Sequence, residues 1–236
     1  MPIKRCLLGL VLWSAAALAA AQSPPARAYA LGAFDGIEIS GSAAVRFTQG
    51  AVDQIAVEGD DSKSIDVEVS GGTLTIRSHG AWKFWSTRQQ VLLVTARQLK
   101  RVAISGAGSF HAPEAVRAER LVVAISGSGS VRFDQLDAQS LRFAISGAGD
   151  GSVAGQARDL NVAISGKGRF NGEQLASEAA KVSISGVGDA QVWSSHDLSI
   201  AVTGVGNVDY WGSPQVRRSV SGSADIKHRG EKPAPR

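Results

Sequence analysis

The chain has 236 residues, a formal net charge of +4 at pH 7, 44% hydrophobic residues and a single cysteine. This length supports one substantial domain with a buried core, and one cysteine excludes a disulfide framework. Loss of Lys4 and Arg5 with an N-terminal signal would lower the charge from +4 to +2, which is not basic enough for a nucleic-acid-binding protein.

Residues 1–21 have the pattern of a secretory signal peptide. Lys4 and Arg5 precede an apolar run over 6–18, and Ala19-Ala20-Ala21 forms a small-residue cleavage site. The run is shorter than the roughly 20 residues of a membrane-spanning helix. We therefore expect export to the periplasm or the cell surface, with no membrane span after cleavage. A retained N-terminal anchor is the alternative.

Residues 22–33 contain Pro24-Pro25 and predict a short flexible leader. The segment 34–98 alternates apolar and polar residues, which predicts antiparallel or irregular strands that start and cap the repeated region 99–228. Within it, 79–90 is a polar and aromatic insertion that carries Trp82, Phe84 and Trp85. This insertion is either a binding loop or a plug over an open end of the fold, and an unpaired end favours the plug.

A pentapeptide repeats through 99–228. ISGAG at 104–108 is followed by ISGSG, ISGAG, ISGKG, ISGVG, VTGVG and VSGSA in steps of 21, 20, 19, 20, 18 and 18 residues, and ISGSA already stands at 39–43. Each unit has two short alternating stretches, with Leu121, Val123 and Ile125 before the corner and Val131 and Phe133 after it. The pattern has the period of strands, and the glycines suit a sharp corner.

A near-constant period of this size indicates stacked repeats, because one unit cannot bury its apolar face alone. We predict an all-β fold, a right-handed parallel β-solenoid with coils of about 20 residues, capped by the less regular N-terminal region. A propeller would need a period of roughly 40 residues, and a sandwich rarely repeats one pentapeptide in phase. Residues 229–236 predict a disordered polar tail.

The segment FDGIEISGSAAVRFTQG, the ISGxG series and the closing VDYWGSPQVRRSVSGSADI resemble the head GIN-domain family over 34–228. That family comprises bacterial exported proteins labelled as candidate autotransporter-adhesin head domains. The resemblance implies a β-helical fold and export, mostly to the envelope of Gram-negative bacteria. It implies no catalytic residues.

The residue after each corner predicts an outward polar column in which Asp150, Arg169 and Asp189 alternate in sign. We interpret it as a structural ladder, because Arg169 would repel a cation bound between the acids. Ser105, with Ser126 and its later equivalents, forms a second column whose hydroxyls can bond the corner backbone. The four histidines share no column, so we expect no catalytic residue, metal or cofactor.

Trp193 and Trp211 each lie five residues after a corner glycine, which predicts neighbouring positions on the outward side of adjacent coils. They could form a platform for sugar rings or a partner protein, or they could be covered by the C-terminal segment around Pro214. A large exposed apolar patch is the exception, which favours the cover.

The sequence predicts a non-enzymatic structural or binding module of the bacterial envelope, adhesin-like in character. Candidate binding residues are Trp193, Trp211, Trp82 and Trp85, and candidate partners are an envelope polysaccharide or another envelope protein. The alternative is a carbohydrate-active enzyme or a carbohydrate-binding protein on a β-helix scaffold. An enzyme needs clustered acids, whereas Asp134, Glu173 and Asp197 are dispersed in the sequence.

Overall fold

The computed structural model describes residues 27–30, 32–58, 65–78 and 91–232, so the predicted signal peptide and the 79–90 insertion with Trp82 and Trp85 lie outside the described residues. The described residues form strands joined by turns, without a helix. The strands are β1 (Arg27–Ala30), β2 (Gly36–Gly41), β3 (Ala44–Gln49), β4 (Gln54–Glu58), β5 (Ile65–Ser70), β6 (Thr73–Ser78), β7 (Val91–Ala96), β8 (Arg101–Gly106), β9 (Ser109–Ile125), β10 (Ser130–Ile145), β11 (Asp150–Ile164), β12 (Lys167–Trp211) and β13 (Gln215–His228).

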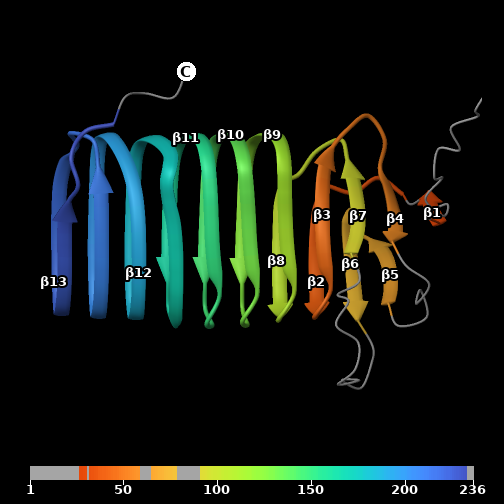
Figure 1. Ribbon diagram of the computed structural model, residues 1–236, viewed down its shortest axis with the longest axis horizontal. Helices are drawn as coiled ribbons and strands as arrows, with labels where there is room; N and C mark the ends of the chain where they lie inside the picture. The colour runs from red at the N-terminus through yellow and green to blue at the C-terminus, as the bar shows by residue number, and fades with distance from the viewer. Residues whose placement is uncertain (1–26, 31, 59–64, 79–90, 233–236) are drawn as a thin grey trace, which may run out of the picture.

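Successive coils stack in parallel along one axis, as Figure 1 shows from β8 to β13. The repeated motif stays in register, because Ile104 pairs with Ile125, Ile125 with Ile145, and Ile145 with Ile164. The sequence separation of each isoleucine pair equals the step between the corresponding pentapeptides. The β-solenoid predicted from the repeat is therefore confirmed.

The inward residues of each coil form a continuous apolar core. The predicted column before the corner is buried from Ile104 to Val202, and Ile145 has 1% of its surface exposed. After the corner, Phe47, Phe110 and Phe133 follow one another with ring centroids 5.7 and 5.3 Å apart. Stacking coils thus buries apolar surface that a single coil would leave in water.

The N-terminal region adds coils in an order that differs from the chain order. The forerunner motif at 39–43 lies in a full coil made by β2 and β3, which pair in parallel with β8 and β9. The later strands β6 and β7 pair in parallel with the other edge of that same coil. The antiparallel pairs, β1 with β4, β4 with β7 and β5 with β6, lie at the far end of the stack (Figure 1).

At the opposite end, β13 forms the last coil and the chain then turns back. The sequence predicts disorder from Arg229 onward, whereas Arg229 to Lys232 contact the coils. Arg229 donates from its backbone N to Tyr210 O at 2.8 Å, and Gly212 N donates to Gly230 O at 3.0 Å. These backbone bonds hold a segment whose polar composition alone does not predict order. We call Arg229–Lys232 the C-terminal strap.

Candidate binding site

Two parallel columns of polar side chains follow the corners on the outward side of the coils. In the first column, Ser130 pairs with Asp150 and Asp150 with Arg169, which confirms the predicted stacking. The second column lies two residues further along each strand, where outward parity returns. It includes Arg132, Ser152 and Asn171, and it continues in the last coils with Asp209 opposite Lys227. The sequence-based prediction did not include this second column, although the two-residue period could have revealed it.

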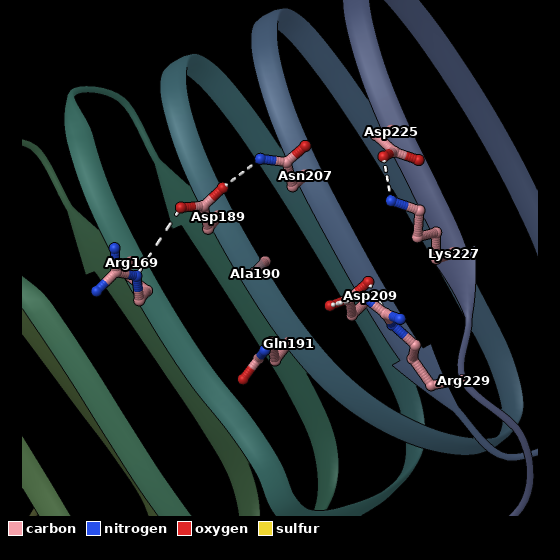
Figure 2. A pocket seen from close by; sticks show the side chains of 9 residues that line it. All are labelled: Arg169, Asp189, Ala190, Gln191, Asn207, Asp209, Asp225, Lys227 and Arg229. Carbon is pink, nitrogen blue, oxygen red and sulfur yellow. Dashed lines mark hydrogen bonds and ion pairs between the residues drawn. The ribbon is translucent and has the colours of Figure 1, made fainter.

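Both columns line an open hollow of about 370 Å³ over the last coils (Figure 2). The residues around it are Arg169, Asp189, Ala190, Gln191, Asn207, Asp209, Asp225, Lys227 and Arg229. Three carboxylates and three cationic groups are among them, so their charges balance. Ala190 is the one apolar side chain in the lining. The surface therefore offers hydrogen-bond donors and acceptors without a net charge.

Ion pairs and hydrogen bonds connect the side chains of this hollow. Arg169 Nε lies 3.8 Å from Asp189 Oδ2, and Asn207 Nδ2 donates to Asp189 Oδ1 at 2.7 Å. Arg229 donates to both carboxylate oxygens of Asp209, at 2.9 and 3.1 Å, and Asp209 raises the pKa of the Arg229 guanidinium. A bidentate pair of this kind fixes both side chains in one orientation.

A second hollow, of about 340 Å³, lies over β10, β11 and β12 and brings together two acids that look dispersed in the sequence. Asp134 and Glu173 both line it, from coils two steps apart. Asp134 accepts from Arg132 Nε at 2.6 Å and lies 2.9 Å from His111 Nε2. Both hydrogen bonds lower the pKa of the Asp134 carboxyl, and the one with His111 has the larger effect. Asp134 therefore stays ionised at neutral pH.

The serine column bonds the backbone of the preceding coil. Ser126 Oγ donates to Ile104 O at 3.3 Å, and Ser146 Oγ donates to Ile125 O at 3.4 Å. A nucleophilic serine would need a histidine within reach. The described histidines lie away from this column. His111 lies beside Asp134, His228 stacks on Tyr210, and His196 Nδ1 lies 2.8 Å from the hydroxyl of Ser195, which is not a member of the column. The hydroxyls thus serve the corner structure.

Trp193 and Trp211 lie in neighbouring coils, since the residues that follow them, Ser194 and Gly212, are in close backbone contact. Trp193 is only 8% exposed. Trp211 is partly exposed, and Lys232 Nζ lies 4.3 Å from its ring centroid. The two indoles do not form an open platform. The C-terminal strap, and not the segment around Pro214, contacts the Trp211 ring through Lys232.

Among the described residues, no three His, Cys, Asp or Glu side chains gather closely enough to hold a metal ion. Within the same residues, no helix is long and apolar enough to cross a membrane.

A family model described as "Putative auto-transporter adhesin, head GIN domain" matches residues 33–214. A crystal structure of a "putative adhesin" from Bacteroides fragilis is similar, with a TM-score of 0.80 at 24% identity over 88% of this chain and 96% of that chain. A "putative lipid binding protein" from Parabacteroides distasonis (TM-score 0.66) and a "putative adhesin" from Parabacteroides merdae (TM-score 0.65) each share 20% identity over 89% of this chain and 96% of theirs. At these identities the likeness concerns the fold. No match was found among curated proteins.

Proposed function

The chain belongs to the head GIN domain family of adhesin-like β-solenoids, and on that premise we propose that it is an exported, non-enzymatic binding module of the bacterial cell envelope. Its partner on this proposal is an envelope polysaccharide. The signal-like residues 1–21 support export. The family membership supports adhesion as the class of activity, and the ligand is argued from the surface.

The observation that carries the proposal is the hollow over the last coils (Figure 2). Sugars present many hydroxyl groups, each of which can donate and accept a hydrogen bond. Asp189, Asn207 and Gln191 offer carboxylate and amide groups toward this surface, at a spacing set by coils about 4.8 Å apart. A long polysaccharide could run along such a ladder and repeat its contacts from coil to coil.

The composition of the hollow favours a neutral polar ligand over a lipid. A lipid-binding role is the description of one structural neighbour. Lipid chains require an apolar cavity, however, and Ala190 is the one apolar side chain in the lining. The exposed valines of this region, Val187 and Val205, stand on the corners outside the hollow.

A carbohydrate-active enzyme is the second candidate, because Asp134 and Glu173 line one hollow from coils about 10 Å apart. Glycosidases need one carboxyl group that holds a proton near neutral pH. The lowered pKa of Asp134 opposes that role, and Glu173 is bound to Lys232 Nζ at 2.7 Å. Release of reducing ends from purified polysaccharide, lost on Asp134→Asn, would favour this candidate.

The binding proposal is tested by Asn207→Ala, measured by affinity electrophoresis in gels that contain purified envelope polysaccharide. Loss of one hydrogen-bonding group should raise the Kd about three- to tenfold. Asn161→Ala is the matched control, because Asn161 is an outward amide on the strand before the corner. Equal dissociation constants for the two variants would contradict binding at the hollow.

A further inference from the structure

The C-terminal strap places a lysine in a site that is built for an ammonium group. Lys232 Nζ donates to the Glu173 carboxylate at 2.7 Å and to the Glu173 carbonyl oxygen at 3.0 Å. The same nitrogen lies 4.3 Å from the centroid of the Trp211 ring. We call the Trp211 indole with these two Glu173 oxygens the ammonium site. The Lys232 side chain as a whole is 23% exposed, so most of its surface is covered.

Each component of this site satisfies a different requirement of a primary ammonium. An ammonium carries three N–H donors and no acceptor, and Glu173 accepts two of them. The negative face of the indole attracts the positive charge. The carboxylate supplies the opposite charge at hydrogen-bond distance. A quaternary ammonium could use the indole and the charge but could not donate the two hydrogen bonds.

The strap is held to the coils by several contacts besides those of Lys232. Arg229 is fixed by the bidentate pair with Asp209, whose side chain is 19% exposed. Beyond it, Gly230 accepts from Gly212 N, and Glu231 accepts from Ser213 Oγ at 2.5 Å. Release of Lys232 therefore needs only the last residues of the strap to separate from the coils, while β13 and Arg229 stay in place.

We propose that the ammonium site binds a primary ammonium group of an external partner, and that Lys232 fills it in cis until such a group displaces it. The ligand class is a primary amine, carried by a lysine side chain or by an amino sugar. A tethered group competes at an effective concentration on the order of millimolar. The wild-type protein should therefore select partners that present many amines, and removal of Lys232 should open the site to a single one.

Isothermal titration calorimetry with n-butylamine tests the site, on wild type and on Lys232→Ala. We expect Lys232→Ala to bind n-butylamine at least tenfold more tightly than wild type does. Adding Glu173→Gln to Lys232→Ala should return the affinity to the wild-type level, as should adding Trp211→Leu. Glu173 is a partly exposed side chain, so Glu173→Gln keeps the test valid if Trp211→Leu does not fold by circular dichroism.

Two further arms identify the chemistry and its source. Butyltrimethylammonium should bind Lys232→Ala at least tenfold more weakly than n-butylamine, because it cannot donate hydrogen bonds. Nα-acetyl-lysine amide and glucosamine distinguish a peptide amine from an amino sugar, with N-acetylglucosamine as the uncharged control. Equal affinity of wild type and Lys232→Ala for n-butylamine, or unchanged binding after Glu173→Gln, would overturn the proposal.

The ammonium site is separate from the polysaccharide hollow. Trp211 and Glu173 are absent from the lining of that hollow. Asn207→Ala, made in the Lys232→Ala background, should therefore leave amine binding unchanged while it weakens polysaccharide binding. Failure of one site and failure of the other are thus separate results.

Discussion

The corner glycines are required by the close approach of successive coils. A Cβ on Gly147 would lie 2.1 Å from the carbonyl oxygen of Gly127, which also accepts the Ala148 N–H at 2.9 Å. A Cβ on Gly149 would lie 2.6 Å from Ile125 Cγ2. The backbone bond between coils and the side-chain packing beneath it leave no space at either position. The residue between the two glycines points outward, which explains why it varies along the chain.

Gly147→Ala should therefore destabilise the fold more than any change at the neighbouring position. Forcing a methyl group against a carbonyl oxygen of the next coil requires the two backbones to separate, at a cost of about 3 kcal/mol. For a domain of this size, the Tm should fall by roughly 6–12 °C in a thermal unfolding scan. Ala148→Ser, at the exposed position of the same corner, should change the Tm little. A Tm of Gly147→Ala within 2 °C of wild type, roughly the scatter of a neutral substitution, would show that the coils adjust freely.

At the scale of single strands and coils, the sequence predicts most of the fold because the repeat determines both the register and the inward residues. The spacing of the motif defines the register, and the two-residue alternation defines which side chains point inward. Gly151 marks a limit of this alternation. It stands at an inward position without a side chain, and a Cβ there would lie 2.4 Å from Phe143 Cζ, which fills the space. The sequence alone does not reveal that the large Phe143 side chain fills the space that Gly151 leaves; the stacked structure does.

The elements that the sequence does not predict are those whose neighbours are distant in the chain. The coil formed by β6 and β7 stacks outside β2 and β3, although it follows them in sequence. The C-terminal strap is polar and a proline follows it in the sequence, so this segment has the composition of a disordered tail. Lys232 contacts the Trp211 ring and binds Glu173, which lies 59 residues earlier in the chain. The sequence therefore predicts the stacking of the first polar column, which it assigns to a structural ladder, and it does not predict the second column or the contacts of the strap.

The register of a coil is tested by two charge substitutions on β10. Ile145 is buried between its neighbours at 1% exposure, whereas Arg142 points outward and is exposed. Ile145→Asp should place an unpaired carboxylate between stacked apolar residues and cost about 4 kcal/mol or more, with loss of cooperative unfolding. Arg142→Asp should change the unfolding midpoint in urea only slightly. Equal midpoints for the two variants would contradict the inward assignment of the column.

At the scale of the whole molecule, a solenoid must end in a way that prevents the stack from continuing. Antiparallel strands close the N-terminal side (Figure 1). On the C-terminal side, β13 pairs with β12 alone among the described strands, and Val220 is 47% exposed. An open strand edge over an apolar core invites pairing with another chain.

The inward column of the last coil ends the stack with a charge. Arg218 occupies the position that Ile200 holds in the coil before it. Its guanidinium lies 5.9 Å from the Tyr210 ring centroid and donates to the Tyr210 hydroxyl at 3.2 Å. The side chain thereby covers the core with a group that stays hydrated. An inward-pointing charge on an edge strand is a known way to prevent edge-to-edge association.

Arg218→Ile should therefore convert the open end into a surface that self-associates. The substitution extends the apolar column by one coil and removes the charge that a second copy would have to desolvate. Light scattering coupled to size exclusion, over a concentration series, should give a mass that rises above that of the monomer. Arg217→Ile is the matched control, because it removes the same charge from the outward side of β13, where Arg217 Nη1 lies 3.6 Å from Asp197 Oδ1. A constant monomer mass for Arg218→Ile would mean that the backbone edge, and not this side chain, determines whether the coil ends are soluble.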